Sequence, residues 1–251
     1  MQTTLKKFAF FGDSHHPYHH RKAWSLFLTA MEDFKPDVLV CLGDLADFYK
    51  ISRFQKDPTR ENTFDQEIEQ DNKALDELDS LGAERKIFIG GNHEDRLARY
   101  LMDTAPELFE TVTVPRLFNL ELRGWEYVPY KEHIKVGKLY MTHDVGSTGP
   151  YAIFRAAATF QHPIVVGHTH RYAATIEGDA LGKHYPAWSF GWLGDIEKVD
   201  YMHKIKLRRQ WSLGFGVGFQ NPENGTTHIQ GVPIVNSKGY SCVVAGKEFT
   251  V

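Results

Sequence analysis

The chain has 251 residues, enough for one large domain with a substantial core, and we expect a single domain over residues 1–251. Its formal net charge of −3 argues against broad electrostatic capture of nucleic acid or anionic membranes and leaves room only for a local basic groove. Only two cysteines are present, and they do not suggest a disulfide framework or a zinc finger. No apolar run approaches the roughly 20 residues that span a bilayer, and no signal peptide precedes the first strand, so the expected location is the cytoplasm.

The first hundred residues alternate between short apolar runs and segments with helical spacing. The apolar runs predict buried strands over residues 8–11, 38–42 and 87–89. Apolar side chains at helical spacing predict a helix over residues 24–34, a second over residues 64–81, and a third that contains Leu97 and Leu101. Thr63 and Gln66 have the spacing of a capping box at the start of the second helix.

The second half of the chain is richer in strand patterns. These patterns predict strands over residues 118–122, 125–128, 133–136, 138–141 and 164–166. Pro150 fits the first turn of a helix that runs to about Phe160. Beyond residue 170 we expect antiparallel strands, including residues 213–219, where apolar residues alternate with glycines. The expected fold is of the α/β class, with two packed sheets and helices outside them.

Polar side chains follow five of the apolar strands, at the point where each strand ends. They are Asp13 and His15, Asp44, Asn92 and His93, His143, and His168 and His170. Strands of one sheet bring such ends together even when they are far apart in the chain. Carboxylate and imidazole donors with few thiols favour divalent zinc, manganese, iron or nickel. With His93 left as a proton donor, the other seven side chains are too many ligands for one tetrahedral ion and suit two ions about 3.5–4 Å apart, bridged by a carboxylate.

Each of these residues also has an ordinary explanation. A single histidine after a strand is usually a polar residue with a satisfied hydrogen bond, and an aspartate after a glycine is usually a turn residue. Coincidence at five strand ends together is the weaker explanation, so the sequence favours a metal site.

The motifs Gly12-Asp13-Ser14-His15, Gly43-Asp44, Gly91-Asn92-His93-Glu94, His143 and Gly167-His168-Thr169-His170 resemble those of the calcineurin-like metallophosphoesterases. That resemblance implies a four-layer α/β/β/α sandwich of two mixed sheets flanked by helices. It implies that Asp13, His15 and His170 hold one metal ion, that Asn92, His143 and His168 hold the other, and that Asp44 bridges both. His93 would then be the proton donor and Asp47 the carboxylate that orients it. Two divalent metal ions are implied as cofactors, with manganese expected and zinc, iron or nickel as alternatives.

The resemblance implies a hydrolase in which a metal-bound hydroxide attacks a phosphate ester. Phe48 stands where protein serine/threonine phosphatases carry an arginine, which disfavours a phosphoprotein substrate. We therefore expect a phosphodiesterase or phosphatase that acts on nucleotides or nucleic-acid ends. The alternative is an inactive scaffold of the same fold that binds proteins. It is disfavoured because none of the ligand positions, nor the histidine donor, has been lost.

Three groups of residues near these motifs admit more than one interpretation. His16, His19 and His20 either face solvent or start a helix, or they contact substrate. One or more of Arg53, Arg96 and Arg99 would clamp a phosphate, or they form a solvated face. The aromatic residues after the last motif are expected in the core, and the alternative is a stacking wall for a nucleobase. These aromatic residues are Tyr172, Tyr185, Trp188, Phe190 and Trp192.

Overall fold

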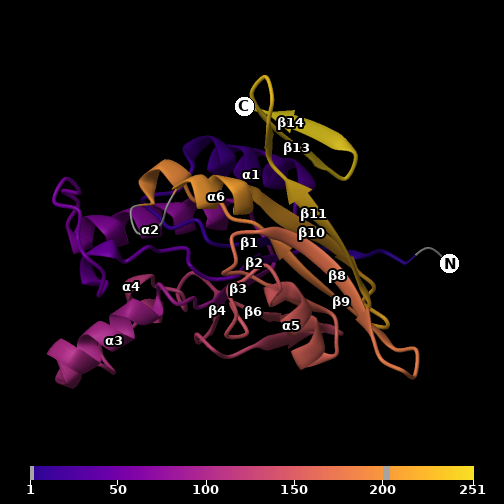
Figure 1. Ribbon diagram of the computed structural model, residues 1–251, viewed down its shortest axis with the longest axis horizontal. Coiled ribbons are helices and arrows are strands. Elements are labelled where there is room, and N and C mark those ends of the chain that lie inside the picture. Colours follow the sequence, from indigo (N-terminus) through magenta and orange to yellow (C-terminus); the bar gives the residue numbers. More distant parts are fainter. Residues whose placement is uncertain (1–2, 200–203) are drawn as a thin grey trace.

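The computed structural model describes residues 3–199 and 204–251, and its central feature is a pair of packed β-sheets (Figure 1). The first sheet has the strand order β11 (Thr227–Pro233), β10 (Gly214–Gln220), β1 (Lys6–Phe11), β2 (Val38–Cys41), β3 (Arg85–Ile89) and β4 (Trp125–Val128). Strands β1 to β4 are parallel, whereas β10 pairs antiparallel with both β1 and β11. The carboxyl ends of β1, β2 and β3 therefore lie at one edge of this sheet.

The second sheet is also mixed. Its strand order is β5 (Ile134–Val136), β6 (Leu139–Thr142), β7 (Ile164–Val166), β9 (His184–Phe190) and β8 (Tyr172–Gly178). The central strands β6, β7 and β9 are parallel, and the two edge strands run antiparallel to their neighbours.

Helices cover the outer face of each sheet, as Figure 1 shows for α1 and α2 on one side and α5 on the other. The helices are α1 (Arg21–Phe34), α2 (Phe64–Ser80), α3 (Asp95–Thr104), α4 (Val114–Leu117), α5 (Ala152–Phe160) and α6 (Lys204–Gln210). Short 3₁₀ turns are η1 (Tyr49–Ile51), η2 (Pro106–Leu108) and η3 (Ile196–Lys198). The predicted capping box is present: the Thr63 side chain accepts from the Gln66 backbone, and the Gln66 side chain accepts from the Thr63 backbone.

The alternation of side chains along β1 shows how the layers are held together. Phe8 and Phe10 are buried in the core between the two sheets, where Met141 and Phe190 of the second sheet meet them. Ala9 and Phe11 point the other way, into the core that α1 and α2 cover. A third cluster buries α5 against the second sheet. The molecule is thus an α/β/β/α sandwich, which confirms the predicted fold class.

Three parts of the chain differ from the expectation, and one of them is α6, because only strands and turns were expected beyond residue 170. The strand predicted over residues 118–122 is wrong: the turns that follow α4 occupy this region, and Phe118 and Leu120 are buried there without pairing in a sheet. The structure also has a small antiparallel sheet of β12 (Val235–Asn236), β13 (Tyr240–Val244) and β14 (Lys247–Thr250), which contacts α1. Within the described ranges, no helix is long and apolar enough to cross a bilayer.

Candidate metal centre

The two sheets bring their polar strand ends to a common edge. Asp13, Asp44 and Asn92 follow β1, β2 and β3 of the first sheet, and His143 and His168 follow β6 and β7 of the second. Backbone hydrogen bonds tie the loops within each sheet, such as the bond of 2.9 Å from Asp13 N to the carbonyl oxygen of Gly43. A bridge between the sheets is the bond from His168 N to the Asp13 carboxylate, at 3.0 Å.

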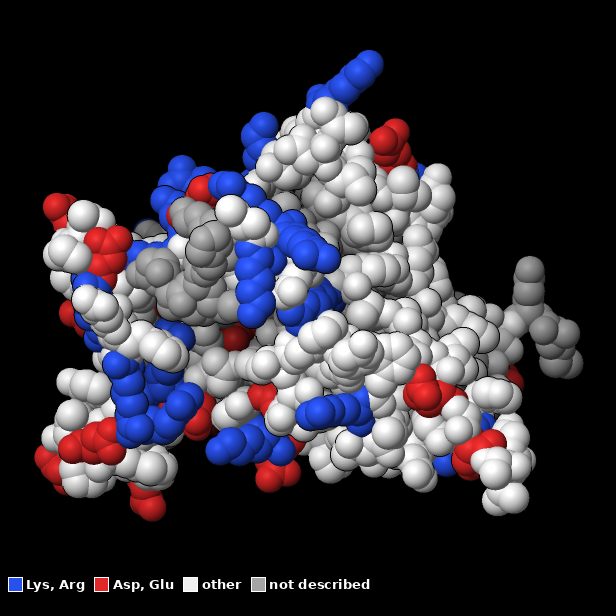
Figure 2. Space-filling view, in the orientation of Figure 1, with Lys and Arg blue, Asp and Glu red and all other residues white. Residues whose placement is uncertain are grey.

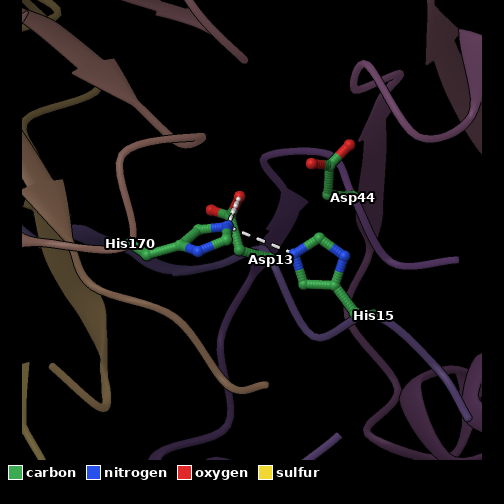
Figure 3. A group of neighbouring side chains, drawn as sticks. All are labelled: Asp13, His15, Asp44 and His170. Carbon is green, nitrogen blue, oxygen red and sulfur yellow. Dashed lines mark hydrogen bonds and ion pairs between the residues drawn. The ribbon is translucent and has the colours of Figure 1, made fainter. Parts of the chain in front are cut away.

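The first group of candidate ligands consists of Asp13, His15, Asp44 and His170 (Figure 3). One donor atom from each lies within 4.8 Å of the others, and all four residues are buried. His170 Nε2 lies 3.2 Å from His15 Nε2 and 3.2 Å from Asp13 Oδ1. Three donors thus converge on one point, with Asp44 beside them.

The second group consists of Asp44, His143 and His168, again with donor atoms within 4.8 Å of one another. His143 Nε2 lies 3.4 Å from Asp44 Oδ2 and 3.2 Å from Asn92 Oδ1, which places the amide in the same group. His143 Nδ1 donates to the carbonyl oxygen of Leu42 at 2.8 Å, and this bond fixes the ring with Nε2 facing the site. Asp44 belongs to both groups.

The donor set fits divalent cations. Ligand atoms 2.0–2.2 Å from one ion lie about 3.0–3.5 Å from each other, which is the spacing found between these side chains. His168 Nδ1 is buried without a hydrogen-bond partner among the described residues, an arrangement that costs free energy unless a ligand meets it. Burial and the neighbouring Asp44 carboxylate raise the pKa of Asp13 to about 6, although His143 opposes them. A cation between Asp13 and Asp44 would offset the repulsion between their two negative charges.

Five of the candidate ligands share an unusual backbone conformation with positive φ. Asp13, His15 and Asp44 have φ of 52°, His168 has φ of 66° and His170 has φ of 55°, all in the left-handed region that non-glycine residues seldom adopt. Such conformations cost about 1–3 kcal/mol each and cluster at functional sites. The strain turns the side chains of both sheets toward one centre.

Glycines allow the loops to approach closely. A Cβ atom on Gly91 would lie 2.1 Å from Asp44 Oδ1, and one on Gly43 would lie 2.5 Å from His143 Nδ1. Because Cβ atoms are never found so close to other heavy atoms, these two positions require glycine. The glycines that precede Asp44 and Asn92 in the sequence thus serve the geometry of the site.

Glu94 holds together the loops that follow β2 and β3, a role that the sequence analysis did not predict. Its buried carboxylate accepts hydrogen bonds from three backbone N–H groups: those of Gly91 at 2.8 Å, Asp44 at 2.9 Å and Ala46 at 3.0 Å. It therefore ties the loop after β3 to the loop after β2. An acidic residue directly after the predicted Asn92-His93 pair was the available signal, but two of its three partners, Asp44 and Ala46, lie 50 and 48 residues away.

His93 lies beside the two groups and is held by Asp47. Its Nδ1 donates to the Asp47 carbonyl oxygen at 3.0 Å and lies 3.5 Å from the Asp47 carboxylate, while its Nε2 lies 3.9 Å from Asp44 Oδ2. Burial lowers the pKa of His93, but Asp44 and Asp47 outweigh this effect and raise it above the ordinary value. Burial alone would raise the pKa of Asp47, but His93 and His15 hold it well below its usual range.

Arg96 contacts both members of this pair. Its Nη2 donates to the Nε2 atom of His93 at 3.0 Å, and its Nη1 donates to the Asp47 carbonyl oxygen at 2.8 Å. Because a guanidinium can only donate, the Nε2 atom of His93 is the acceptor in this contact. Protonation of His93 Nε2 would break this contact and free Arg96 for an anion.

The three histidines near the first motif have different environments. His20 caps α1 by accepting from Ala23 N at 3.2 Å, which confirms a helix-start role, and its Nε2 lies 3.1 Å from the Tyr240 hydroxyl. His16 is buried and stacks on His19 with ring centroids 4.0 Å apart, so the prediction of a solvent-facing ring is wrong for His16.

The aromatic residues after the last motif divide between core and site. Tyr185 and Phe190 are buried in the cores, as expected. Trp192 instead stacks on the His170 ring, with centroids 4.8 Å apart and planes 13° apart. Trp211, which the sequence did not single out, meets the same ring edge-on at 4.2 Å. Two indoles therefore pack against one candidate ligand.

A four-layer sandwich with acidic, amide and imidazole donors at the shared edge of its sheets defines a metallophosphoesterase fold. The family model described as calcineurin-like phosphoesterase matches residues 6–193, and the chain belongs to that family. The resemblance drawn from the motifs is thereby confirmed.

Individual proteins that resemble this chain share less than 30% of its residues. The chain is 26% identical over 228 residues to the Gene 54 protein of Mycobacterium phage D29, and 28% identical over 232 residues to that of Mycobacterium phage L5. Each alignment covers 84% of this chain and 88% of the phage protein. Among solved structures, Vps29 of Chaetomium thermophilum has a TM-score of 0.51 at 10% identity, covering 99% of this chain and 98% of that one. This likeness concerns the fold alone.

Proposed function

We propose that the protein is a dinuclear metal-dependent hydrolase of phosphate esters, a phosphodiesterase or phosphatase that acts on nucleotides or nucleic-acid ends. The observation that carries the proposal is Asp44, which lies in both donor groups with His93 beside it. A carboxylate shared by two sets of imidazoles is the arrangement that a pair of cations requires.

The residues would divide as follows. Asp13, His15 and His170 hold one ion, Asn92, His143 and His168 hold the other, and Asp44 contacts both. When bound, divalent ions supply positive charge for the phosphate oxygens and lower the pKa of water from 15.7 to roughly 7. Manganese is the metal that we expect, since the carboxylate and amide oxygens suit it, and zinc, iron and nickel, which the imidazoles suit, are the alternatives.

His93 would protonate the leaving alcohol. Its Nε2 faces the shared carboxylate, while Asp47 holds Nδ1 and so fixes the ring's orientation. General acid help of this kind contributes about 10²–10⁴-fold to the rate. Arg96 lies within reach of the same position and would bind a phosphate oxygen once His93 carries its proton.

Hydrolysis of two aryl esters tests the proposal. We expect the manganese-loaded protein to hydrolyse bis-p-nitrophenyl phosphate or p-nitrophenyl phosphate, and chelation to abolish this activity. The ratio of the two rates gives the preference for diesters or monoesters. Absence of hydrolysis with manganese, zinc, iron and nickel in turn, in protein that binds two ions by calorimetry, would contradict the enzyme proposal.

A test of whether His93 donates a proton requires a substrate with a poor leaving group. His93→Ala should lower the rate on an alkyl phosphate ester by about 10²–10⁴-fold and affect nitrophenyl esters much less, because nitrophenolate leaves without a proton. His228→Ala, on the exposed face of β11, is the matched control and should leave both rates unchanged. Equal losses on both classes of ester in His93→Ala would argue against proton donation.

A further inference from the structure

Two hollows meet over the candidate metal centre. One, of about 520 Å³, is bounded by the candidate ligands and extends to Arg171 and Lys206; we call it the α6 arm. The other, of about 720 Å³, runs along α3 and η1; we call it the α3 arm. Both are lined by Phe54, Asn92 and Arg96, so they adjoin and form one groove, with the metal centre in the α6 arm next to the junction.

The groove is basic although the chain is not. Among the described residues, seven Lys and Arg side chains line it against three carboxylates, one of which is the candidate ligand Asp44. The other two carboxylates, Asp95 and Asp103, pair with Arg99 and Arg53, so the excess comes from the remaining five basic side chains. The basic side chains beyond Arg96 are Arg171 and Lys206 in the α6 arm, and Lys50, Arg53, Arg99 and Lys131 in the α3 arm. Figure 2 shows Lys and Arg side chains gathered around a central hollow with acidic atoms at its floor. In a chain of net charge −3, this local excess marks a surface for a polyanion.

Aromatic rings accompany the charges in both arms. Trp211 lines the α6 arm, Phe54 lies at the junction with 63% of its surface exposed, and Tyr100 and Tyr130 line the α3 arm. Exposed aromatic rings along a basic track are the means by which proteins bind single-stranded nucleic acid, since every base can stack. Duplex DNA, whose bases are already stacked, makes no use of them.

We propose that single-stranded nucleic acid lies along this groove, with one internal phosphodiester at the metal centre and the flanking nucleotides in the two arms. This rests on the proposed phosphoesterase activity, and it names internal phosphodiesters of a single strand as the substrate in place of nucleotides or strand ends. A mononucleotide would fill one hollow, since ligand pockets of 300–1,000 Å³ enclose whole small molecules, and the second basic arm would have no role. A polynucleotide uses both arms.

The reaction at that position is hydrolysis. The oxygen of one water joins phosphorus, the bond from phosphorus to one sugar oxygen breaks, and that oxygen takes a proton. The products are one strand that ends in a hydroxyl and one that ends in a phosphate monoester. Because both arms continue past the metal centre, cleavage needs no free strand end.

Binding of a fluorescent 15-nucleotide oligothymidylate, followed by anisotropy at several salt concentrations, tests the groove. All proteins carry His93→Ala, which slows turnover, and are loaded with manganese. The test variant adds Arg99→Ala, Lys131→Ala and Lys206→Ala. The control adds Lys135→Ala, Lys138→Ala and Lys183→Ala, which remove the same charge from exposed positions on or beside the second sheet.

Each lost phosphate contact lowers the salt slope of single-strand binding by about 0.7, so the test variant should lose about 2 in slope and the control none. Thymidine monophosphate should compete at least about a hundredfold more weakly than the oligonucleotide. The proposal is overturned by equal slopes in test and control, by equal competition from the mononucleotide, or by no oligonucleotide binding at all.

The unsubstituted protein, assayed in parallel on bis-p-nitrophenyl phosphate, separates this inference from the proposed function. Aryl ester hydrolysis combined with equal salt slopes would refute the groove and keep the phosphoesterase. If the test variant loses salt slope as expected but the unsubstituted protein does not hydrolyse the aryl ester, nucleic-acid binding in the groove is supported and the phosphoesterase activity is not. Thermal melts of all variants check that the substitutions leave the fold intact.

Discussion

Gly91→Ala offers a sharp test of how the loops build the metal centre. The new methyl group would lie 2.1 Å from Asp44 Oδ1 and 2.5 Å from Asp44 N, and Cβ atoms do not come within 3.0 Å of other heavy atoms. Relief therefore requires a relative movement of roughly 1 Å between the loops after β2 and β3, and overpacking of this kind costs about 1–3 kcal/mol. In a chain of this length that is a fall of roughly 2–12 °C in Tm.

The effect on activity should be larger than the effect on stability. Displacing a reacting group by 1 Å can lower a rate about 10²-fold, and here the displaced carboxylate lies in both donor groups. We expect Gly91→Ala to bind manganese more weakly by calorimetry and to hydrolyse bis-p-nitrophenyl phosphate at about a hundredth of the normal rate.

Gly178→Ala is the matched control for this experiment. It lies at the end of β8, where the nearest atom to a new Cβ is His184 Cδ2 at 3.3 Å, the end of a side chain that can move. It should retain metal affinity, rate and Tm. A Gly91→Ala protein with normal metal affinity and rate would refute the reasoning, because Asp44 would then tolerate the movement.

Three further substitutions test particular contacts by urea unfolding. Glu94→Gln replaces an acceptor of three backbone N–H bonds by a group with one oxygen, and should cost about 1–3 kcal/mol, whereas the exposed Glu69→Gln should cost little. Thr63→Ala removes the capping box of α2 and should cost about 1 kcal/mol; an unchanged midpoint would mean that the cap contributes nothing. Burial raises the pKa of Asp79, but bonds from Lys86 and Arg123 outweigh it and lower that pKa, so Asp79→Asn should destabilise the protein at pH 7. Because a group with a lowered pKa stabilises the fold fully only above its unfolded pKa of about 3.9, this difference should shrink as the pH falls below 3.9 and vanish below the lowered pKa of folded Asp79.

Much of the fold and of the candidate site follows from local patterns in the sequence. The strands at residues 8–11, 38–42 and 87–89 are wholly apolar because both of their faces are buried, and this is visible without a structure. Parallel strands place their carboxyl ends at one edge, so Asp13 and Asp44 could be expected side by side.

The remaining features depend on contacts that the sequence does not encode locally. Phe118 and Leu120 form an apolar run that reads as a strand, yet both side chains reach the core from turns. Arg96 could be named as a phosphate clamp, but its contacts with His93 and Asp47 depend on how α3 meets the loop after β2. Trp211 reaches His170 from a different part of the chain, and no spacing predicts that approach.

The division of the donors between the sheets links metal binding to the assembly of the sandwich. Asp13, Asp44 and Asn92 belong to the first sheet and His143 and His168 to the second, so neither half can form the site by itself. An ion held by both halves would resist their separation and stabilise the docked state by RT ln(1 + [L]/Kd), about 2.7 kcal/mol at a hundredfold excess over Kd. The cations would thus link the two sheets, and chelation should lower the thermal stability of the whole molecule as well as abolish its activity.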